Sequence, residues 1–598
     1  MLALLRRRRR LAWVLLLSRA LGLAPFAPAP VRRPAEAAAP APKPGSPEYY
    51  RTYSGTPGRG AFLEADWRGA WVSVDQRAQG AHAITTVHGE IPQSLIGGKL
   101  VRCGPANFER GGRRYEHVLD GDGFVLSIDF ETPTSGRFQG RFVETRQFLA
   151  EEKAEAIIFR NTFGTQRGGG WLANAGDVKL KNVANTNVVA WGKKVLALWE
   201  AGVPHELDAS TLETLGEWDP QKSEPGTFEG GGEMRGVTID GGMVDGALDL
   251  ARCFTAHPHV DPSAKRLVTF TWAQQPMLGE MRLEFVEHDS AWVEQQRVQH
   301  SMPGCTMAPH DFAITPSWHV FFENRMTMDL AQFIVGNKGP AQVLMMEPAK
   351  PCRLHLVRRD GSRAAVVVDV GPFFCIHTGV AYEDVDSAGR HRIVVMSSGW
   401  DLATGGSAEP RPFLGAWGGE MPNFDVIPPT WLFRTIVDAE TGKLLSHRVL
   451  PAALEHCIEH PHVDPLREGA ATAAAGGAGR APPRYIYASL CNDVGLSSPP
   501  LGYARFDVRT QAVKTWYPET RTFCEELVVV PKDADADAAL EDKAQVWLLG
   551  LTYSADKQTT SLIILDGADL ESGPVCELLL PAVIPHGIHG SFQDARDK

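Results

Sequence analysis

Short apolar runs separated by turn residues recur along the chain from about residue 60 to its end. Most runs are about five residues long and rich in Val, Ile, Leu, Phe and Thr, which is typical of β-strands. We expect strands at Lys99–Cys103, Phe124–Ile128, Val195–Trp199, Leu267–Thr271, Val320–Phe322, Ala365–Asp369, Ile393–Met396, Arg484–Ala488, Val546–Leu549 and Ser561–Leu565. Long amphipathic helices are few. The pattern therefore predicts an all-β fold, and many evenly spaced strands favour a β-propeller, in which sheets are arranged radially.

One string of six residues occurs twice, at His257–Pro262 and at His460–Pro465. Either the two copies mark equivalent positions in two blades, or the repetition is a coincidence. Two other segments, the Ala/Gly-rich Arg467–Pro483 and the Asp/Ala-rich Lys532–Asp542, lack the apolar side chains needed to pack against a core. We interpret them as surface insertions between strands.

The first fifty residues have a different character from the rest of the chain. A basic run at Arg6–Arg10 precedes a short apolar run at Leu11–Leu17, and a Phe26-Ala27-Pro28 junction leads into a basic, Pro/Ala-rich stretch. This order predicts a removable targeting segment over residues 1–50. It resembles the two-part plastid address of algae with secondary plastids, and the alternative is an ordinary secretory or mitochondrial presequence. Residues 60–598 are predicted to form one domain, and no later stretch is long and apolar enough to predict a spanning helix.

Composition narrows the class of protein further. The chain has 598 residues, a formal net charge of −11 and 43% hydrophobic residues, enough to bury a large core. The acidic balance argues against a nucleic-acid partner. The nine cysteines contain no CxxC pair, so we interpret them as reduced thiols in a compartment that is not secretory.

Four histidines stand in short and distinctive contexts, spread over more than half of the chain. They are His257 in Thr-Ala-His-Pro-His, His310 in Pro-His-Asp-Phe-Ala-Ile-Thr, His377 in Phe-Phe-Cys-Ile-His, and His589 in Pro-His-Gly-Ile-His-Gly-Ser-Phe. No zinc-finger or HExxH spacing joins them, so only the fold could assemble them into one site. Taken singly, each could be an ordinary core or surface histidine. Four neutral imidazoles together would suit a borderline metal such as iron, copper or zinc.

A histidine that binds a metal usually donates its other ring N–H to a carboxylate. Three acids lie in apolar settings that suit this role, because a carboxylate there is costly unless it is paired. Glu200 follows the run Val195–Trp199, Glu459 precedes His460, and Glu526 precedes an apolar run. Glu525 is a rival to Glu526, since one residue of register decides which side chain faces inward. The alternative for these acids is a buried salt bridge.

Four more histidines lie close to these motifs but do not occupy a ligand position. They are His259, His460, His462 and His586. We interpret them as structural residues.

The histidine and glutamate contexts resemble those of the carotenoid cleavage oxygenases, the family of the retinoid isomerase and the plant carotenoid dioxygenases. Further matching motifs, in family order, are Gly89–Pro92, Gly104-Pro105, Gly111–Arg113, Asp120–Gly123, Asn185–Val188 and Leu198–Gly202. The resemblance covers about residues 60 to 598. The stretches Phe163–Gln166, Leu172–Asn174 and Leu180–Asn187 are similar to the cyanobacterial apocarotenoid 15,15′-oxygenase branch.

The sequence departs from the family pattern at three places. His460 stands where a Phe is usual, His586 replaces a common Tyr or Val, and Glu525-Glu526-Leu527 replaces the usual Gly-Glu-Pro. These departures concern the residues around the ligands and not the ligands themselves.

The resemblance implies a seven-bladed β-propeller with Fe(II) on its axis, held by the four histidines, under a cap of loops and short helices that forms an apolar tunnel. It implies a dioxygenase that uses O2 to cleave a conjugated C=C bond of a carotenoid or apocarotenoid into aldehydes, with retinal as a product in the apocarotenoid branch. No catalytic side chain beyond the metal centre is expected. A stilbene-cleaving dioxygenase, a carotenoid-binding propeller without activity, and a zinc hydrolase are the alternatives.

The segment Met326–Val335 is apolar and nearly uncharged. One interpretation is a core helix. The other is a patch that dips into a bilayer at the mouth of the tunnel, where an oily substrate would be collected.

Overall fold

The computed structural model describes residues 62–218, 253–275, 279–403, 409–415, 419–424, 427–472, 475, 481–492, 497–532 and 544–595. The predicted targeting segment, most of the predicted insertion at 532–542 and part of the insertion at 467–483 lie outside these residues. β-Strands dominate the described residues, and the longest helix among them is Arg146–Ala154 (α3). The all-β prediction is confirmed. None of the described helices is both long and apolar enough to cross a membrane.

Five of the sheets have four or five antiparallel strands, each drawn from neighbouring parts of the sequence. The first contains β7 (Asn187–Trp191), β8 (Lys194–Leu198), β9 (His205–Leu207) and β10 (Thr214–Glu217), and the second β11 (Cys253–Phe254), β12 (His259–Asp261), β13 (Arg266–Gln275), β14 (Glu280–His288) and β15 (Glu294–Pro303). The third contains β16 (Ala313–Ile314), β17 (Trp318–Glu323), β20 (Cys352–Arg358) and β21 (Val366–Gly371), and the fourth β22 (Phe373–Val385), β23 (His391–Asp401), β25 (Trp431–Asp438) and β26 (Leu444–Val449). The fifth contains β27 (Cys457–His462), β28 (Tyr485–Asn492), β29 (Gly502–Asp507) and β30 (Val513–Trp516).

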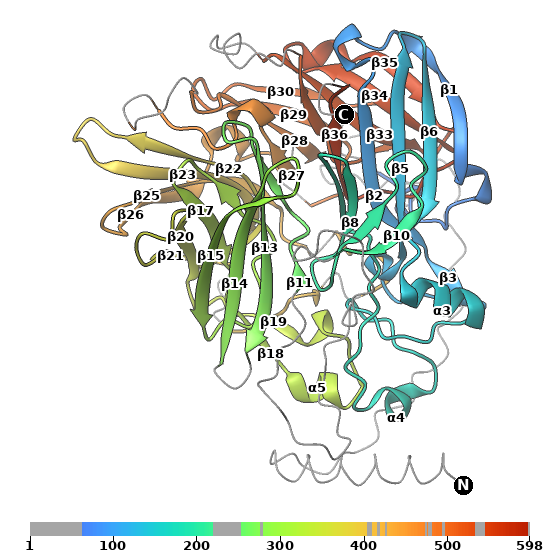
Figure 1. Ribbon diagram of the computed structural model, residues 1–598, viewed down its shortest axis with the longest axis horizontal. Helices are drawn as coiled ribbons and strands as arrows, with labels where there is room; N and C mark the ends of the chain where they lie inside the picture. The colour runs from blue at the N-terminus through green and yellow to red at the C-terminus, as the bar shows by residue number, and fades with distance from the viewer. Residues whose placement is uncertain are drawn as a thin grey trace.

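A larger sheet of ten strands brings the two ends of the described chain together. Its strands are β31 (Thr522–Cys524), β32 (Val528–Pro531), β33 (Val546–Ser554), β34 (Thr559–Asp566), β35 (Pro574–Leu579), β1 (Gly80–Gly89), β6 (Ser135–Phe142), β5 (Asp122–Thr132), β2 (Lys99–Asn107) and β36 (His589–Gln593). The C-terminal β36 pairs with β2, with His589 opposite Cys103, so the last strand closes the ring of sheets. Radially arranged sheets agree with a propeller (Figure 1). The number of seven blades stays a prediction. With the five smaller sheets as five blades, the ten-stranded sheet would have to supply two more, joined through β1.

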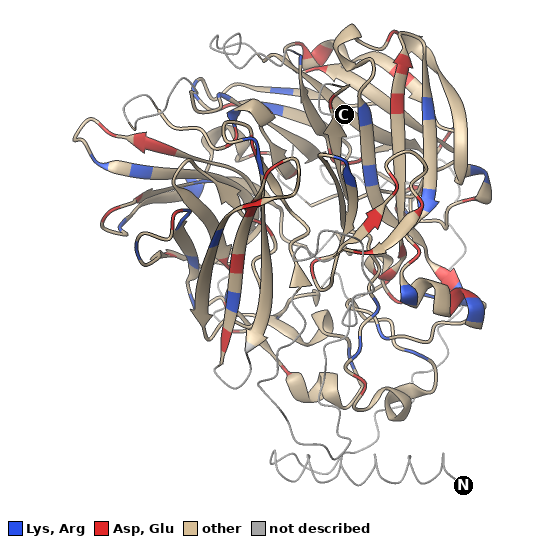
Figure 2. Cartoon of the chain, in the orientation of Figure 1, with Lys and Arg blue, Asp and Glu red and all other residues tan. Residues whose placement is uncertain are grey.

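Short elements connect the sheets. They are the strands β3 (Glu109–Arg110), β4 (Arg113–Arg114), β18 (Met326–Met328), β19 (Leu344–Met346) and β24 (Arg411–Pro412), the helices α2 (Glu64–Gly69), α3, α4 (Gly170–Asn174) and α5 (Leu330–Ile334), and the 3-10 turns η1 (Gln76–Ala78), η2 (Gln93–Leu95), η3 (Val118–Asp120), η4 (Ala341–Val343), η6 (Pro451–Ala453), η7 (Pro465–Arg467) and η10 (Leu570–Ser572). Figure 1 shows α3, α4, α5, β18 and β19 gathered at one end of the sheets, where a cap of loops and short helices was expected. Charges of both signs are scattered over the strands and loops seen in Figure 2.

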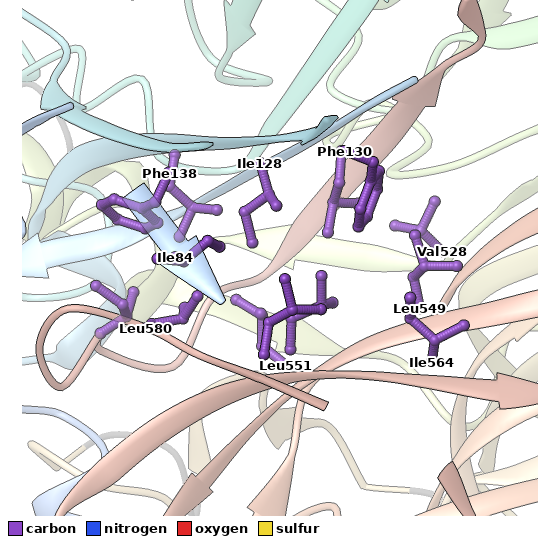
Figure 3. Close-up of a cluster of buried hydrophobic side chains, with 14 of the residues drawn as sticks. Ile84, Ile128, Phe130, Phe138, Val528, Leu549, Leu551, Ile564 and Leu580 are labelled. Atoms are coloured by element: carbon purple, nitrogen blue, oxygen red, sulfur yellow. The ribbon is translucent and has the colours of Figure 1, made fainter. Parts of the chain in front are cut away.

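All ten apolar runs singled out in the sequence overlap strands. They form strands because their branched and aromatic side chains pack between neighbouring sheets. In the ten-stranded sheet, Ile84, Ile128 and Phe138 on one half pack against Leu551 and Ile564 on the other (Figure 3). The two halves of this sheet therefore face each other across a shared apolar core.

Two adjacent leucines on β35 test this packing directly. Leu578 is fully buried in the shared core, whereas Leu579 points the other way and is 41% exposed. We expect Leu578→Ala to lower the free energy of unfolding by about 2–5 kcal/mol, because it leaves a cavity in a packed core. Leu579→Ala, on the same strand, should change it by less than about 0.5 kcal/mol. Urea denaturation measures both, and equal effects of the two substitutions would contradict the packing described.

Candidate metal centre

The four singled-out histidines lie on, or directly beside, edge strands of four different sheets. His257 lies between β11 and β12, His310 three residues before β16, His377 within β22, and His589 at the first position of β36. These edge strands converge, so that the ring centroid of His257 lies 4.4 Å from that of His310 and 4.6 Å from that of His589. The fold thus brings together four residues that the sequence places far apart.

The ring nitrogens of these histidines have the spacing of ligands around one ion. The Nε2 atom of His310 lies 3.1 Å from that of His257 and 3.3 Å from that of His377. One ring nitrogen from each of the four lies within 4.8 Å of the others. A metal bound at about 2.1 Å would place adjacent octahedral nitrogens about 3.0 Å apart and opposite ones about 4.2 Å apart. The observed spacing fits that geometry.

Three of the rings are held from behind by the predicted glutamates. The Nδ1–O distances are 2.6 Å for His310 and Glu200, 2.8 Å for His377 and Glu459, and 2.9 Å for His589 and Glu526. A ring that donates from Nδ1 carries its lone pair on Nε2. Lone pairs facing one another at about 3 Å repel unless a proton or a metal cation lies between them. The donor set therefore fits a metal ion.

Glu525 and Glu526 have different hydrogen-bond partners. Glu526 reaches His589, and its second oxygen accepts from Nη1 of buried Arg102 at 3.1 Å. Glu525 instead accepts from Nη2 of Arg102 at 3.0 Å and from the backbone N–H of Gly587 at 2.8 Å. Of the two rivals, the structure places Glu526 behind the histidine, while Glu525 anchors the backbone two residues before it.

At the glutamates and at His377, burial and the neighbouring charges shift the pKa in opposite directions. Burial raises the pKa of a carboxyl, but His377 lowers that of Glu459 to about 2, and His589 and His462 hold the pKa of Glu526 well below its usual range. Burial lowers the pKa of an imidazole, yet Glu459 raises that of His377 to about 9. The carboxylates are ionised at neutral pH, and a cation that binds His377 must displace a proton.

An aspartate that the sequence analysis did not single out joins several of these segments. Asp311 follows His310, and its Oδ2 accepts from the backbone N–H of Thr378 at 2.7 Å. Its Oδ1 accepts from Nε2 of His259 at 3.3 Å. Burial works against a charge on His259, but Glu468 and Asp311 raise its pKa to about 10, so that both ring nitrogens donate. The only sequence signal was that Asp311 adjoins a candidate ligand.

His460 has an unusual backbone in which a non-glycine residue adopts φ of +52°. The pairing of β27 with β28 shifts register between Glu459 and His462, so the bulge turns the consecutive side chains of Glu459 and His460 toward the centre. The His460 ring lies 5.0 Å from that of His377. In the repeated six-residue string, His460 lies within the edge strand β27, whereas His257 lies between β11 and β12.

The other two histidines that were interpreted as structural have packing or hydrogen-bonding roles. His462 donates from Nε2 to Glu526 at 2.9 Å. The ring of His586 packs against Trp67 and Trp71, with centroids 4.9 and 5.2 Å away.

An apolar group includes two residues of the strand that carries His377. It consists of the buried Met326, Leu344, Met346, Phe374, Trp400, Leu402 and Ile427, with partly buried Met307, Met328, Ile376, Phe413 and Phe424 packed against them. Phe374 and Ile376 belong to the same strand as His377, β22. The apolar group therefore includes side chains from the strand that carries a candidate ligand.

The apolar segment Met326–Val335 divides between the two predicted environments. Met326 and Phe333 are buried, as a core segment requires, but Leu330 on α5 is 53% exposed. Gly176, just after α4, donates its backbone N–H to the Ile334 carbonyl at 2.7 Å, so α4 and α5 are neighbours. On α4, Trp171 is 48% and Leu172 54% exposed.

Comparisons with known proteins agree with this geometry. The family model of RPE65, the retinal pigment epithelial membrane protein, matches residues 73–594. The apocarotenoid-15,15′-oxygenase of Synechocystis sp. is 29% identical over 90% of this chain and 98% of its own length, and the chloroplastic carotenoid cleavage dioxygenase 7 of Oryza sativa subsp. japonica is 24% identical over 86% and 88%. The crystal structure of cobalt-substituted Synechocystis ACO superposes with a TM-score of 0.74, at 28% identity, over 90% of this chain and all of that one. Because the family model spans most of its length, this chain belongs to the RPE65, or carotenoid oxygenase, family.

Proposed function

We propose that this protein is a non-haem Fe(II) dioxygenase that cleaves a conjugated C=C bond of an apocarotenoid or carotenoid with O2, giving aldehydes. The observation that carries the proposal is the convergence of four imidazole nitrogens within 4.8 Å, three of them on rings backed by glutamates. The relatives are named for apocarotenoid and carotenoid cleavage, which supports this substrate class.

The donor set favours a borderline divalent metal, and iron suits the proposed oxidation. Iron, when bound, would supply the redox and Lewis-acid chemistry that O2 requires. The residues of this chain supply its surroundings: Glu200, Glu459 and Glu526 fix the tautomer and orientation of three rings. Four protein ligands in a six-coordinate geometry would leave two positions open.

The chain also has to bring one double bond of a long, uncharged molecule to the histidines. Apolar side chains suit such a substrate. The group that includes Phe374, Ile376 and Met328 takes two of its members from β22, the strand of His377. We propose that this group borders the polyene. Orientation of the reacting bond would then be its main contribution to the rate.

We further propose that the end of the molecule formed by α4 and α5 touches a membrane. Trp171, Leu172 and Leu330 are exposed on these two adjoining helices, and neither helix contains a charged residue (Figure 2). An aromatic and two aliphatic side chains are typical of surfaces that rest in the interfacial region of a bilayer. Such contact would give an oily substrate a path from lipid to the site.

The activity is tested with purified, iron-loaded protein incubated under O2 with a panel of carotenoids, apocarotenals and stilbenes. We expect shorter aldehydes from apocarotenals, identified by chromatography and mass spectrometry. His377→Ala should abolish both product and bound iron, whereas His391→Ala, an exposed histidine in the adjacent strand β23, should leave both unchanged.

Each other outcome of this assay has a clear meaning. Products only from stilbenes would favour the stilbene-cleaving alternative. No product from any compound, with iron fully bound, would overturn the dioxygenase assignment and leave a carotenoid-binding propeller. Activity with zinc against an ester or amide would point to the hydrolase.

The distinct positions of Glu525 and Glu526 give a second test. Glu526→Gln should weaken metal binding by about 10–100-fold, since it removes the charge that orients His589 and pairs with Arg102. Glu525→Gln removes a charge from the same arginine but touches no histidine of the four, so its effect on metal affinity should be smaller. Metal content by mass spectrometry after dialysis against a graded chelator compares the two, and equal losses would show that Glu526 has no special link to the ligand.

The membrane proposal is tested by sedimentation with phosphatidylcholine vesicles. Combined Trp171→Ser, Leu172→Ser and Leu330→Ser should reduce binding at least about tenfold, because burial of each such side chain contributes about 1.5–3 kcal/mol. The control replaces Val87 and Leu579, which are 58% and 41% exposed on the paired strands β1 and β35. Equal binding by both variants would show that α4 and α5 do not form the membrane contact.

A further inference from the structure

Asp311 makes hydrogen bonds that cross between sheets. It follows His310 in the segment leading to β16, and its Oδ2 accepts from the backbone N–H of Thr378 at 2.7 Å. Thr378 follows His377 in β22, which belongs to a different sheet. Oδ1 of the same carboxylate accepts from the backbone N–H of Phe312 at 2.7 Å. One buried carboxylate therefore ties the backbone beside one candidate ligand to the backbone beside another.

His259 extends this connection to a third segment. It lies two residues after His257, and its Nε2 donates to Oδ1 of Asp311 at 3.3 Å. Its ring packs edge-on against Phe312, with centroids 4.7 Å apart, and its Nδ1 donates to Glu468. The ring is thus held at both nitrogens and packed against Phe312. It fixes the start of β12 relative to Asp311.

The three segments joined in this way carry three of the four candidate ligands. The Nε2 atoms of His257 and His377 lie 3.1 and 3.3 Å from that of His310. His589 is anchored separately, through the bonds of Arg102 and Glu525 around Gly587. The bonds of Asp311 and His259 therefore act on three of the four candidate ligands, and other bonds position His589.

We propose that Asp311 and His259 form a positioning unit that sets the spacing of His257, His310 and His377 and thereby holds the bound metal in place. This inference rests on the proposed metal centre and adds a role for two residues that are not among the four candidate ligands. A carboxylate is required because its two oxygens together accept from the Thr378 N–H, the Phe312 N–H and the His259 ring. An amide offers one acceptor oxygen, so it would face a buried donor with its own N–H groups.

The experiment compares Asp311→Asn with Asp120→Asn. Asp120 is a matched control, because it is also buried and also accepts two backbone N–H groups, from Phe163 at 2.8 Å and Thr165 at 2.9 Å, in the segment around η3. Both variants are loaded with cobalt(II), whose visible absorption reports ligand geometry, and the release of cobalt to a chelator is timed. Thermal unfolding of each is recorded in parallel.

We expect Asp311→Asn to change the cobalt spectrum and to weaken retention by about 10–100-fold, the range found for residues that orient metal ligands. Asp120→Asn should keep the spectrum and release rate of the unmodified protein, even where its melting temperature falls equally. An unchanged spectrum and release rate in Asp311→Asn, or the same change in both variants, would overturn the positioning role. Failure of the unmodified protein to bind any metal would instead overturn the proposed metal centre.

Two substitutions of His259 separate its two contacts. The amide nitrogen of Gln can occupy the position of Nε2 and still donate to Asp311, whereas that of Asn corresponds to Nδ1, which faces Glu468. We expect His259→Gln to retain cobalt better than His259→Asn. The reverse order would show that the bond to Glu468, and not the one to Asp311, governs retention.

Discussion

The close approach of the imidazole nitrogens is the constraint on which the rest of the structure depends. Nε2 atoms about 3 Å apart repel one another unless a proton or a metal cation lies between them, so the protein has to hold the rings in place. It does so with glutamates that bind the outer ring nitrogens and with hydrogen bonds to the neighbouring backbone. Those carboxylates are themselves costly to bury, and Arg102 and His462 lower that cost at Glu526.

The ring topology determines when this site can exist. His589 arrives on β36, the last strand of the fold, which pairs with β2 near the start of the described chain. No local stretch of the sequence can therefore assemble all four histidines, and the complete donor set forms only when the ring closes. Because a metal would bind only the closed form, its binding free energy would add to the stability of closure.

The sequence predicted the parts of the structure that depend on local pattern. Strands such as Phe124–Ile128 were evident because buried strands are continuous apolar runs. The choice between Glu525 and Glu526 could not be made, because these residues lie between two short strands, β31 and β32, where simple alternation does not hold. Asp311 was missed, and His259 was identified only as a structural histidine, because their contact spans 52 residues and leaves no periodic signal. The Met326–Val335 segment divided between core and surface, since hydropathy does not show which side of a short helix is covered.

At the bulge at His460, the packing around the metal centre overrides the backbone conformation that a β-strand prefers. A regular strand would turn Glu459 and His460 to opposite faces. The chain nevertheless accepts a left-handed residue, at a cost of about 1–2 kcal/mol, and a broken register against β28. Such strain persists only where the surroundings fix it, and here the surroundings are the carboxylate that holds His377 and the packed sheets on either side. The stability that tolerates this strain comes from the apolar cores between sheets, so the blades supply the rigidity that the polar centre lacks.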